Sequence, residues 1–291
     1  MFAATGKTVV NGTVGEMLVR DIASITAYAL GVEQPETWTS RVPSDLFDGV
    51  EATERPVYEN IVYDRSHETV PTPTEGVSSY ITDKNLLHYL PFDGDVTDLC
   101  GGETSQSERL FYEDEGYFGK AASTKVGYAS IHNYAPGTDS FSISIWINTP
   151  GVKSDPLLFS NKNWKNGLVK GYAMVINEDG LLHFNLGDGK NRVDMYTNLP
   201  LNYKEGWMNV ILVVDRDANV VKTSVDFGEF TTMIIPESFK DVPFDSYDVL
   251  NIGNDGTGKY RPLFANIDEF MMFDGALTEE DVASLKAYYG K

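Results

Sequence analysis

The segment 141–147, Phe-Ser-Ile-Ser-Ile-Trp-Ile, constrains the fold of this chain more than any other segment. Its residues alternate with a period of two, and alternate residues of a β-strand point to opposite faces. One face therefore carries Phe141, Ile143, Ile145 and Ile147. Because a strand with a continuous apolar face must cover it with a second layer, we expect these four side chains to be buried between two layers.

Similar short apolar segments recur from about residue 86 to the end of the chain, separated by Gly, Asn and Asp. Many short strands with regular turns predict an all-β fold, a two-sheet antiparallel sandwich. A final helix is expected over 278–288, because Thr278 and Asp281 form the capping pattern of a helix start. The other expected strands are 86–92, 171–176, 181–186, 207–214, 220–226, 249–252 and 266–273.

The charge balance of the 291 residues narrows the range of partners. The chain has 43 Asp plus Glu and 23 Lys plus Arg, a formal net charge of −20. A surface this acidic repels nucleic acid and anionic lipid, so neither is expected as a partner. It suits hard cations such as Ca²⁺, although a merely well-solvated surface has the same composition. No stretch approaches about 18 uninterrupted apolar residues, so no membrane insertion is expected.

The first part of the chain differs from the rest and predicts a short helical N-terminal extension. Gly31 is placed to end a helix whose apolar residues recur at spacings of four, three and four. These residues are Leu18, Ile22, Ile25 and Ala29. We therefore divide the chain into an extension (1–50), a Pro- and Glu-containing linker (51–85) and the sandwich (86–291). Cys100 is the single cysteine, which excludes an intrachain disulfide.

Six ordered motifs of the sandwich resemble the laminin-G-like, concanavalin A-like jelly rolls of bacterial surface enzymes. The resemblance covers about residues 86–290. Two departures are Trp207-Met-Asn209, where the family usually has Trp-His, and Val225-Asp-Phe-Gly228, where it often has Val-Asp-Gly. The resemblance implies a lectin- or glucanase-type jelly roll in an extracytoplasmic protein that is secreted, periplasmic or attached to the cell surface. The six motifs are 90–94, 116–121, 141–146, 160–164 answered by 187–194, 267–270 and 277–280.

Residues 1–50 resemble the C-terminal tail of an alkaline phosphatase/sulfatase superfamily domain. The similarity rests on segments 6–12, 19–31 and 33–36 and on Arg41-Val-Pro43. The nucleophile and nearly all metal ligands of that superfamily lie upstream of such a tail, and its Asp-His motifs are absent from this chain. The resemblance therefore implies an upstream catalytic domain as a partner within the same, larger enzyme. The alternative is an ordinary N-terminal helical extension.

Catalytic patterns are absent from the sequence. The four histidines lack metal-ligand spacing, and no Gly-x-Ser-x-Gly elbow or phosphate-binding loop is present. A glycosidase on a concanavalin A-like fold needs two carboxylates flanking the scissile bond. The nearest acidic run, Glu113-Asp-Glu115, lies in an expected loop with adjacent carboxylates on opposite sides. We therefore expect no catalytic residues in this chain.

A calcium site is expected at one end of the sandwich. In the family that the chain resembles, the first strand and the last long strand are neighbours, which would bring Asp93 and Asp268 to one ion. Asp95 and backbone carbonyls of the loop would complete the oxygen coordination that Ca²⁺ prefers. The alternative is that the Asp93-Gly-Asp95 segment is only a turn and that Asp268 caps a backbone amide.

A second polar cluster predicts a ligand site. Aromatic faces and planar amides are typical of carbohydrate sites, and Trp164 offers such a face. The alternative is that Lys162 and Arg192 form salt bridges with nearby aspartates and brace adjacent strands. The candidate ligand-binding residues are Asn161, Lys162, Trp164, Asp188, Asn191, Arg192 and Asp194.

Three functions follow as hypotheses. The first is a non-catalytic carbohydrate-binding or adhesion module, the C-terminal part of a larger secreted phosphatase- or sulfatase-like enzyme. The second is a structural accessory domain that binds no sugar. The third is a glycosidase on the same fold. An exposed aromatic ring beside Asn, Asp and Arg favours the first, and a buried, fully paired charge cluster favours the second.

Overall fold

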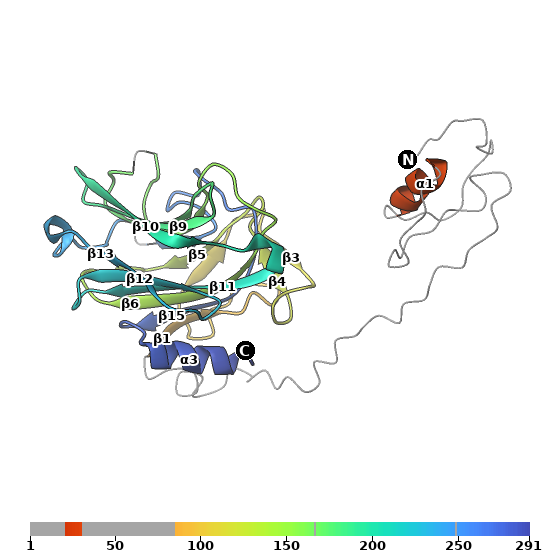
Figure 1. Cartoon of the computed structure of the whole chain (residues 1–291). Helices are drawn as coiled ribbons and strands as arrows, with labels where there is room; N and C mark the ends of the chain where they lie inside the picture. Colours follow the sequence, from red (N-terminus) through yellow and green to blue (C-terminus); the bar gives the residue numbers. More distant parts are fainter. Residues whose placement is uncertain (1–20, 31–84, 166, 248) are drawn as a thin grey trace. The chain divides into compact units, whose positions relative to one another are not determined.

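The computed structural model describes residues 21–30, 85–165, 167–247 and 249–291 (Figure 1). The chain divides into two units, Met1–Thr72 and Pro73–Lys291, and each is described by itself. Of the predicted linker 51–85, all but Asn85 lies outside the described residues. The motifs of the phosphatase-like tail also lie outside them, apart from 21–30.

The described part of the first unit is a single helix, α1 (Asp21–Ala29). This confirms a helix in the N-terminal extension. Ile25 is buried, as expected, but Ala29 is exposed, so the predicted apolar face does not extend to the end of the helix. Leu18 and Gly31 lie outside the described residues.

The described part of the second unit is a sandwich of two antiparallel sheets, which confirms the predicted fold (Figure 1). In the first sheet β1 and β4 both pair with the same side of the long strand β15, whose other side pairs with β6. The strands of this sheet, in spatial order, are β13 (Thr231–Ile234), β12 (Val220–Val225), β11 (Trp207–Asp215), β6 (Phe141–Asn148), β15 (Asn266–Asp274), β4 (Ala121–Ser123) and β3 (Phe111–Glu113), with β1 (Leu86–Leu90) beside β15.

The second sheet forms the opposite layer, and β10 lies at its edge among the described strands. Two short 3-10 helices, η2 (Tyr203–Glu205) and η3 (Glu237–Phe239), lie in connections between the two sheets. The strands, in spatial order, are β10 (Arg192–Pro200), β9 (Leu181–Gly187), β8 (Gly171–Ile176), β7 (Leu157–Ser160), β14 (Val249–Ile252), β5 (Ala129–His132) and β2 (Thr104–Gln106).

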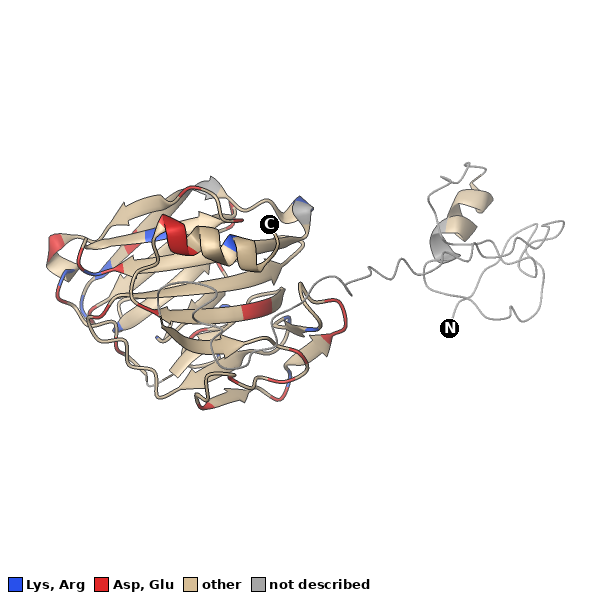
Figure 2. Cartoon of the chain, turned by 90° about the horizontal axis from the view of Figure 1, so that it is seen from below, with Lys and Arg blue, Asp and Glu red and all other residues tan. Residues whose placement is uncertain are grey.

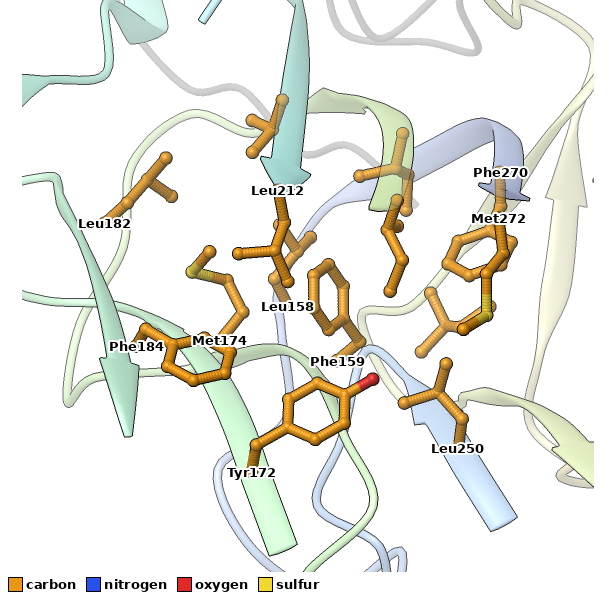
Figure 3. Close-up of a cluster of buried hydrophobic side chains, with 14 of the residues drawn as sticks. Leu158, Phe159, Tyr172, Met174, Leu182, Phe184, Leu212, Leu250, Phe270 and Met272 are labelled. Atoms are coloured by element: carbon orange, nitrogen blue, oxygen red, sulfur yellow. The ribbon is translucent and has the colours of Figure 1, made fainter. Parts of the chain in front are cut away.

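The main core lies between the sheets. Figure 3 shows Leu212 and Met272 of the first sheet beside Tyr172, Phe184 and other side chains of the second. The four apolar residues predicted to share one face of 141–147 are all buried in this core, which confirms their register. Full burial of such side chains stabilises a fold by roughly 1.5–3 kcal/mol each.

The other face of the first sheet is also buried, because the C-terminal helix α3 (Glu279–Tyr288) covers it. Figure 2 shows α3 lying across the strands. Trp146 of β6 and Leu285 of α3 belong to this second apolar cluster, so β6 is buried on both sides. The predicted cap is present: Thr278 Oγ1 accepts from the Asp281 amide at 3.2 Å, and Asp281 Oδ2 accepts from the Thr278 amide at 2.8 Å.

Seven strands were not predicted: β2, β3, β4, β5, β7, β10 and β13. Most are three or four residues long, too short for a periodic pattern to stand out. Among the described residues no helix is long and apolar enough to cross a membrane.

Candidate functional site

A cleft of about 880 Å³ opens over β9 and β10 of the second sheet. Leu182, Phe184 and Leu186 of β9 point into the core, so the residues between them face outward. Connecting segments form the walls: residues 155, 164, 165 and 167, and the ranges 177–179 and 259–261. The cleft is therefore built from one sheet edge and several turns, and its strand residues are His183, Arg192, Asp194 and Tyr196.

The floor is an ordered polar group centred on Asp194. The antiparallel register places Asp194 opposite Asn185 and Tyr196 opposite His183. Asp194 Oδ1 lies 2.8 Å from His183 Nε2 and accepts from Asn185 Nδ2 at 2.6 Å, and its Oδ2 pairs with Arg192 Nε at 2.9 Å. Burial alone would raise the pKa of Asp194, but these hydrogen bonds and the charges of His183 and Arg192 lower it to about 2.

Three aromatic rings surround this polar group. The Tyr196 ring is 52% exposed and stacks on His183, with ring centres 4.3 Å apart. The Trp164 ring stands nearly perpendicular to His183 at 6.3 Å, and Tyr260 is 37% exposed on the facing loop. The cleft thus offers apolar ring faces beside fixed charged groups.

A buried carboxylate positions two of these rings. Asp255 is fully buried, and its Oδ2 accepts from the Trp164 amide at 3.0 Å. Its Oδ1 accepts from the amides of Lys259 at 3.0 Å and Tyr260 at 3.2 Å. One side chain therefore holds together the turn that carries Trp164 and the loop that carries Tyr260.

Two predicted ligand-binding residues, Asn161 and Lys162, lie behind the cleft and are fully buried. Asn161 Nδ2 donates to the Phe244 carbonyl at 2.7 Å, and its Oδ1 accepts from the Tyr172 amide at 2.9 Å. Lys162 Nζ donates to the Gly167 carbonyl at 2.6 Å and to Asn185 Oδ1 at 2.7 Å. Their polar groups are used within the protein, so in this conformation they support the cleft from beneath.

Two further predicted residues, Asp188 and Asn191, lie in the β9–β10 turn and do not line the cleft over β9 and β10. Asp188 Oδ1 accepts from the amides of Lys190 and Asn191 at 2.7 and 2.6 Å. These backbone bonds lower the pKa of Asp188 to about 2. Asp188 borders a separate hollow with Lys170 and Tyr247. Of the predicted set, the structure brings Trp164, Arg192 and Asp194 together.

The predicted bracing alternative is present in part, because the Arg192–Asp194 ion pair forms along β10. Among the described ion pairs neither Lys162 nor Asp188 takes part. Of the predicted salt bridges of Lys162 and Arg192 with nearby aspartates, the one that is present is Arg192–Asp194, and Asp194 also contacts His183 and Asn185.

Several residues of the cleft escaped the sequence analysis, although a signal for some was present. Arg192, Asp194 and Tyr196 alternate in the sequence, as do His183 and Asn185, so each set shares one strand face. The contribution of the 259–261 loop had no sequence signal, since its residues come from a distant part of the chain. The unpredicted lining residues include His183, Tyr196, Lys259, Tyr260 and Arg261.

The acidic residues of the predicted calcium site lie around the loop before β4. Asp93 Oδ1 accepts from the Lys120 amide at 2.8 Å, and Asp268 Oδ2 accepts from the Phe118 amide at 3.0 Å. Asp95 Oδ1 accepts from the nearby Thr97 amide at 2.8 Å. The alternative, in which these carboxylates serve a turn and cap amides, therefore describes contacts that are present.

Two neighbouring acidic side chains in this region, Asp268 and Glu269, are buried. Burial, and then the neighbouring Glu269, raise the pKa of Asp268 well above its usual range. Burial is also the main cause that raises the pKa of Glu269 to about 8, and repulsion from Asp93 adds to it. A hard cation held by Asp93 and Asp268 would offset this repulsion.

Within the described residues, no three His, Cys, Asp or Glu side chains form a metal-binding group. Ligands beyond Asp93 and Asp268 would therefore include backbone carbonyls or water, and calcium stays a prediction.

Comparison with protein families identifies the sandwich. Residues 123–283 match the model of the concanavalin A-like lectin/glucanases superfamily. The chain belongs to this superfamily. A comparison of the sequence with curated proteins gave no match.

Solved structures share the fold of this superfamily member at low sequence identity. Domain 4 of AbnA, a GH43 extracellular arabinanase from Geobacillus stearothermophilus, in complex with arabinotriose, has 20% identity and a TM-score of 0.56. The match covers 70% of this chain and 98% of that domain. The binding domain of Paraclostridial Mosquitocidal Protein 1 has 16% identity, a TM-score of 0.56, and coverages of 70% and 52%.

The binding domain of Botulinum Neurotoxin DC in complex with SialylT has 15% identity and a TM-score of 0.54, with 72% of this chain and 52% of that chain covered. The chain thus spans about half the length of these toxin binding domains. At these identities the likeness establishes the fold.

Proposed function

We propose that the sandwich is a carbohydrate-binding module and that its site is the cleft over β9 and β10. The observation that carries the proposal is the set of accessible rings of Trp164, Tyr196 and Tyr260 around the ordered Arg192–Asp194 pair. Sugar rings present apolar C–H faces that pack on aromatic faces, and hydroxyls that need fixed polar partners. The exposed rings of Tyr196 and Tyr260 favour this function over a structural accessory role.

Fold relatives support the same class of ligand. The structures of the arabinanase domain and of one toxin binding domain were determined in complex with arabinotriose and SialylT. This supports the proposal because the architecture accommodates saccharides in other members, while the ligand of this chain must be decided by its own cleft.

A glycosidase is less well supported by the chemistry of the cleft. The general acid of a glycosidase must hold a proton near neutral pH, which requires a raised pKa. The Asp194 carboxyl has its pKa lowered to about 2, so it stays ionised. We accordingly propose a non-catalytic module. Because the Asp-His motifs of the phosphatase/sulfatase superfamily are absent from this sequence, we also expect no hydrolysis of nitrophenyl phosphate or sulfate esters by this chain.

The attachment of this module to a secreted phosphatase- or sulfatase-like enzyme is also a proposal. It is supported by the resemblance of residues 1–50 to the tail of that superfamily, in which the catalytic residues lie upstream. Its test is to express the gene with its full upstream sequence and assay phosphate and sulfate ester hydrolysis, with this chain alone as the inactive control.

A glycan array with the full chain tests the binding function. We expect specific glycans to be retained, and Trp164→Ala or Tyr196→Ala to reduce binding to them about tenfold. Each change removes buried apolar area and, in addition, about 0.5–1.5 kcal/mol of ring stacking. Tyr247→Ala is the matched control, because Tyr247 is an exposed ring beside the other hollow. Absence of binding to any glycan, or equal loss in the control variant, would refute the proposal.

A further inference from the structure

Beneath the cleft lies a lysine in an unusual position. Lys162 is fully buried, and its ammonium donates to two neutral oxygens, the Gly167 carbonyl and Asn185 Oδ1. Within the described residues its Nζ forms no ion pair. Lysine is rarely buried without a carboxylate partner, because desolvating the charge is costly.

The two acceptors of Lys162 both lead to the cleft. Gly167 lines the cleft wall, and its positive φ of 68° and missing side chain leave room for Arg192, since a Cβ would lie 2.7 Å from the guanidinium. The side-chain nitrogen of Asn185, Nδ2, donates to Asp194 Oδ1 at 2.6 Å. A change of charge on Nζ therefore acts directly behind the Arg192–Asp194 pair.

The charged groups near Lys162 come from β9, β10 and the loop after β14. From β10 these are Arg192 and Asp194, which offset one another, and from β9 the titratable His183 contacts Asp194. The buried carboxylate of Asp255 faces the same turn from the loop after β14 and is used by five donors of the protein. Protonated Lys162 thus adds a positive charge that Asp194 only partly balances.

The upper walls of the cleft are also richer in positive charge than the rest of the chain. Four basic and four acidic side chains line the cleft, whereas the whole chain has 23 basic and 43 acidic residues. Three of the basic side chains, Lys165, Lys259 and Arg261, take part in none of the described ion pairs. The acidic wall residues Asp155, Glu178 and Asp179 take part in none of them either, so the charges of the lining balance. An anionic group entering the cleft therefore meets three basic side chains without the acidic excess of the whole chain, and the buried charge of Lys162 lies behind the floor.

We propose that the cleft binds acidic saccharides, carrying a carboxylate or sulfate, and that the charge on Lys162 makes this binding stronger at pH 6 than at pH 8.5. The inference rests on the proposed carbohydrate-binding function and names its ligand class and regulation.

The direction of this pH dependence follows from the linkage between proton binding at Lys162 and ligand binding in the cleft. Burial, with a smaller contribution from Arg192, lowers the pKa of Lys162 to about 7, against the attraction of Asp194. A bound anion favours the ammonium and raises this pKa, so affinity is highest below pH 7 and falls as the pH rises through it. A rise of one unit on binding corresponds to about a tenfold change in affinity.

The protonation of Lys162 can be measured without any glycan. In a ¹⁵N-lysine NMR titration of the full chain, we expect one side-chain amine to titrate near pH 7 and to be missing in Lys162→Met. Asn185→Asp places a carboxylate beside Nζ and should move the midpoint upward by at least one unit. If every lysine titrates above pH 9 in the wild type, the inference is overturned.

Binding is tested on a glycan array of acidic and neutral sugars at pH 6 and pH 8.5, followed by calorimetry on the best acidic glycan. We expect its affinity to be about tenfold weaker at pH 8.5, with the difference lost in Lys162→Met. Lys286→Met, an exposed lysine of α3, is the matched control and should keep the difference. Neutral glycans should change little between the two pH values.

The outcomes separate this inference from the proposed function. Binding of neutral glycans alone overturns the inference and leaves the carbohydrate-binding function standing, whereas absence of all binding overturns both. A pH dependence that persists in Lys162→Met and disappears in His183→Gln assigns the effect to the imidazole and also overturns the inference.

Discussion

Asp255 and Trp164 are 91 residues apart in the sequence, and the buried carboxylate of the first accepts the backbone N–H of the second at 3.0 Å. The same carboxylate accepts the amides of Lys259 and Tyr260. The relative position of two aromatic walls of the cleft therefore depends on one acidic side chain that is itself fully buried.

Replacing Asp255 by Ala should reduce both stability and binding. The change leaves several buried amides without acceptors, and we expect the free energy of unfolding to fall by about 2–4 kcal/mol. Asp255→Asn keeps one acceptor oxygen and should cost less. Urea unfolding followed by fluorescence measures both variants, and Asp188→Ala, in an exposed turn, should have a smaller effect. Equal stability of Asp255→Ala and the wild type would contradict the positioning role.

The C-terminal helix should be an integral part of the sandwich. Leu285 is fully buried against the outer face of the first sheet, in the cluster that contains Trp146. Leu285→Ala should lower the free energy of unfolding by about 2–5 kcal/mol because it opens a cavity. Lys286→Ala, the exposed neighbour on the same helix, should change it by less than about 0.5 kcal/mol. Thermal or urea unfolding distinguishes the two, and similar values would mean that α3 packs loosely.

Acid should weaken the fold partly through Asp194. The pKa of this carboxyl is about 2 in the folded protein, below its usual value near 4. A lowered carboxyl pKa contributes stability that is present above pH 4 and lost as the pH falls toward 2. Between pH 4 and pH 2 we expect the free energy of unfolding to fall by about 1–2 kcal/mol less in Asp194→Asn than in the wild type. Unfolding curves between pH 2 and 5 test this, with Asp179→Asn, an exposed carboxylate of the same cleft, as control.

Calcium should bind at the loop before β4. Asp93 and Asp268 both contact this loop, and a cation there would relieve the repulsion among Asp93, Asp268 and Glu269. Calorimetric titration of Ca²⁺ into chelator-treated protein should show one site, abolished in Asp93→Ala. At a hundredfold excess over Kd the ion should stabilise the fold by about 2.7 kcal/mol. Asp274→Ala, at the exposed end of β15, serves as control, and binding that survives Asp93→Ala would place the ion elsewhere.

Local patterns were sufficient for the framework of the sandwich. The alternation of 141–147 predicted which side chains of β6 enter the core, and Thr278 with Asp281 predicted the start of α3. These predictions succeed because strand periodicity and helix capping depend on residues within a few positions of each other. The alternation did not reveal that Ser142 and Ser144 are buried as well, since Ser142 contacts the backbone of Gly275 and Leu277 and Ser144 contacts Asn209, all distant in the sequence.

The cleft was decided by tertiary structure. Sequence analysis proposed Trp164, Arg192 and Asp194, but it also proposed Asn161 and Lys162, which the fold turns inward beneath the cleft. His183 meets Asp194 through the register of β9 and β10, and Tyr260 meets Trp164 through Asp255. Composition and spacing along the chain determined the two layers, because burial of apolar faces is a local pattern repeated in each strand. Which polar side chains share a cleft depended on strand register and on contacts between distant loops, and these arise only when the whole sandwich is assembled.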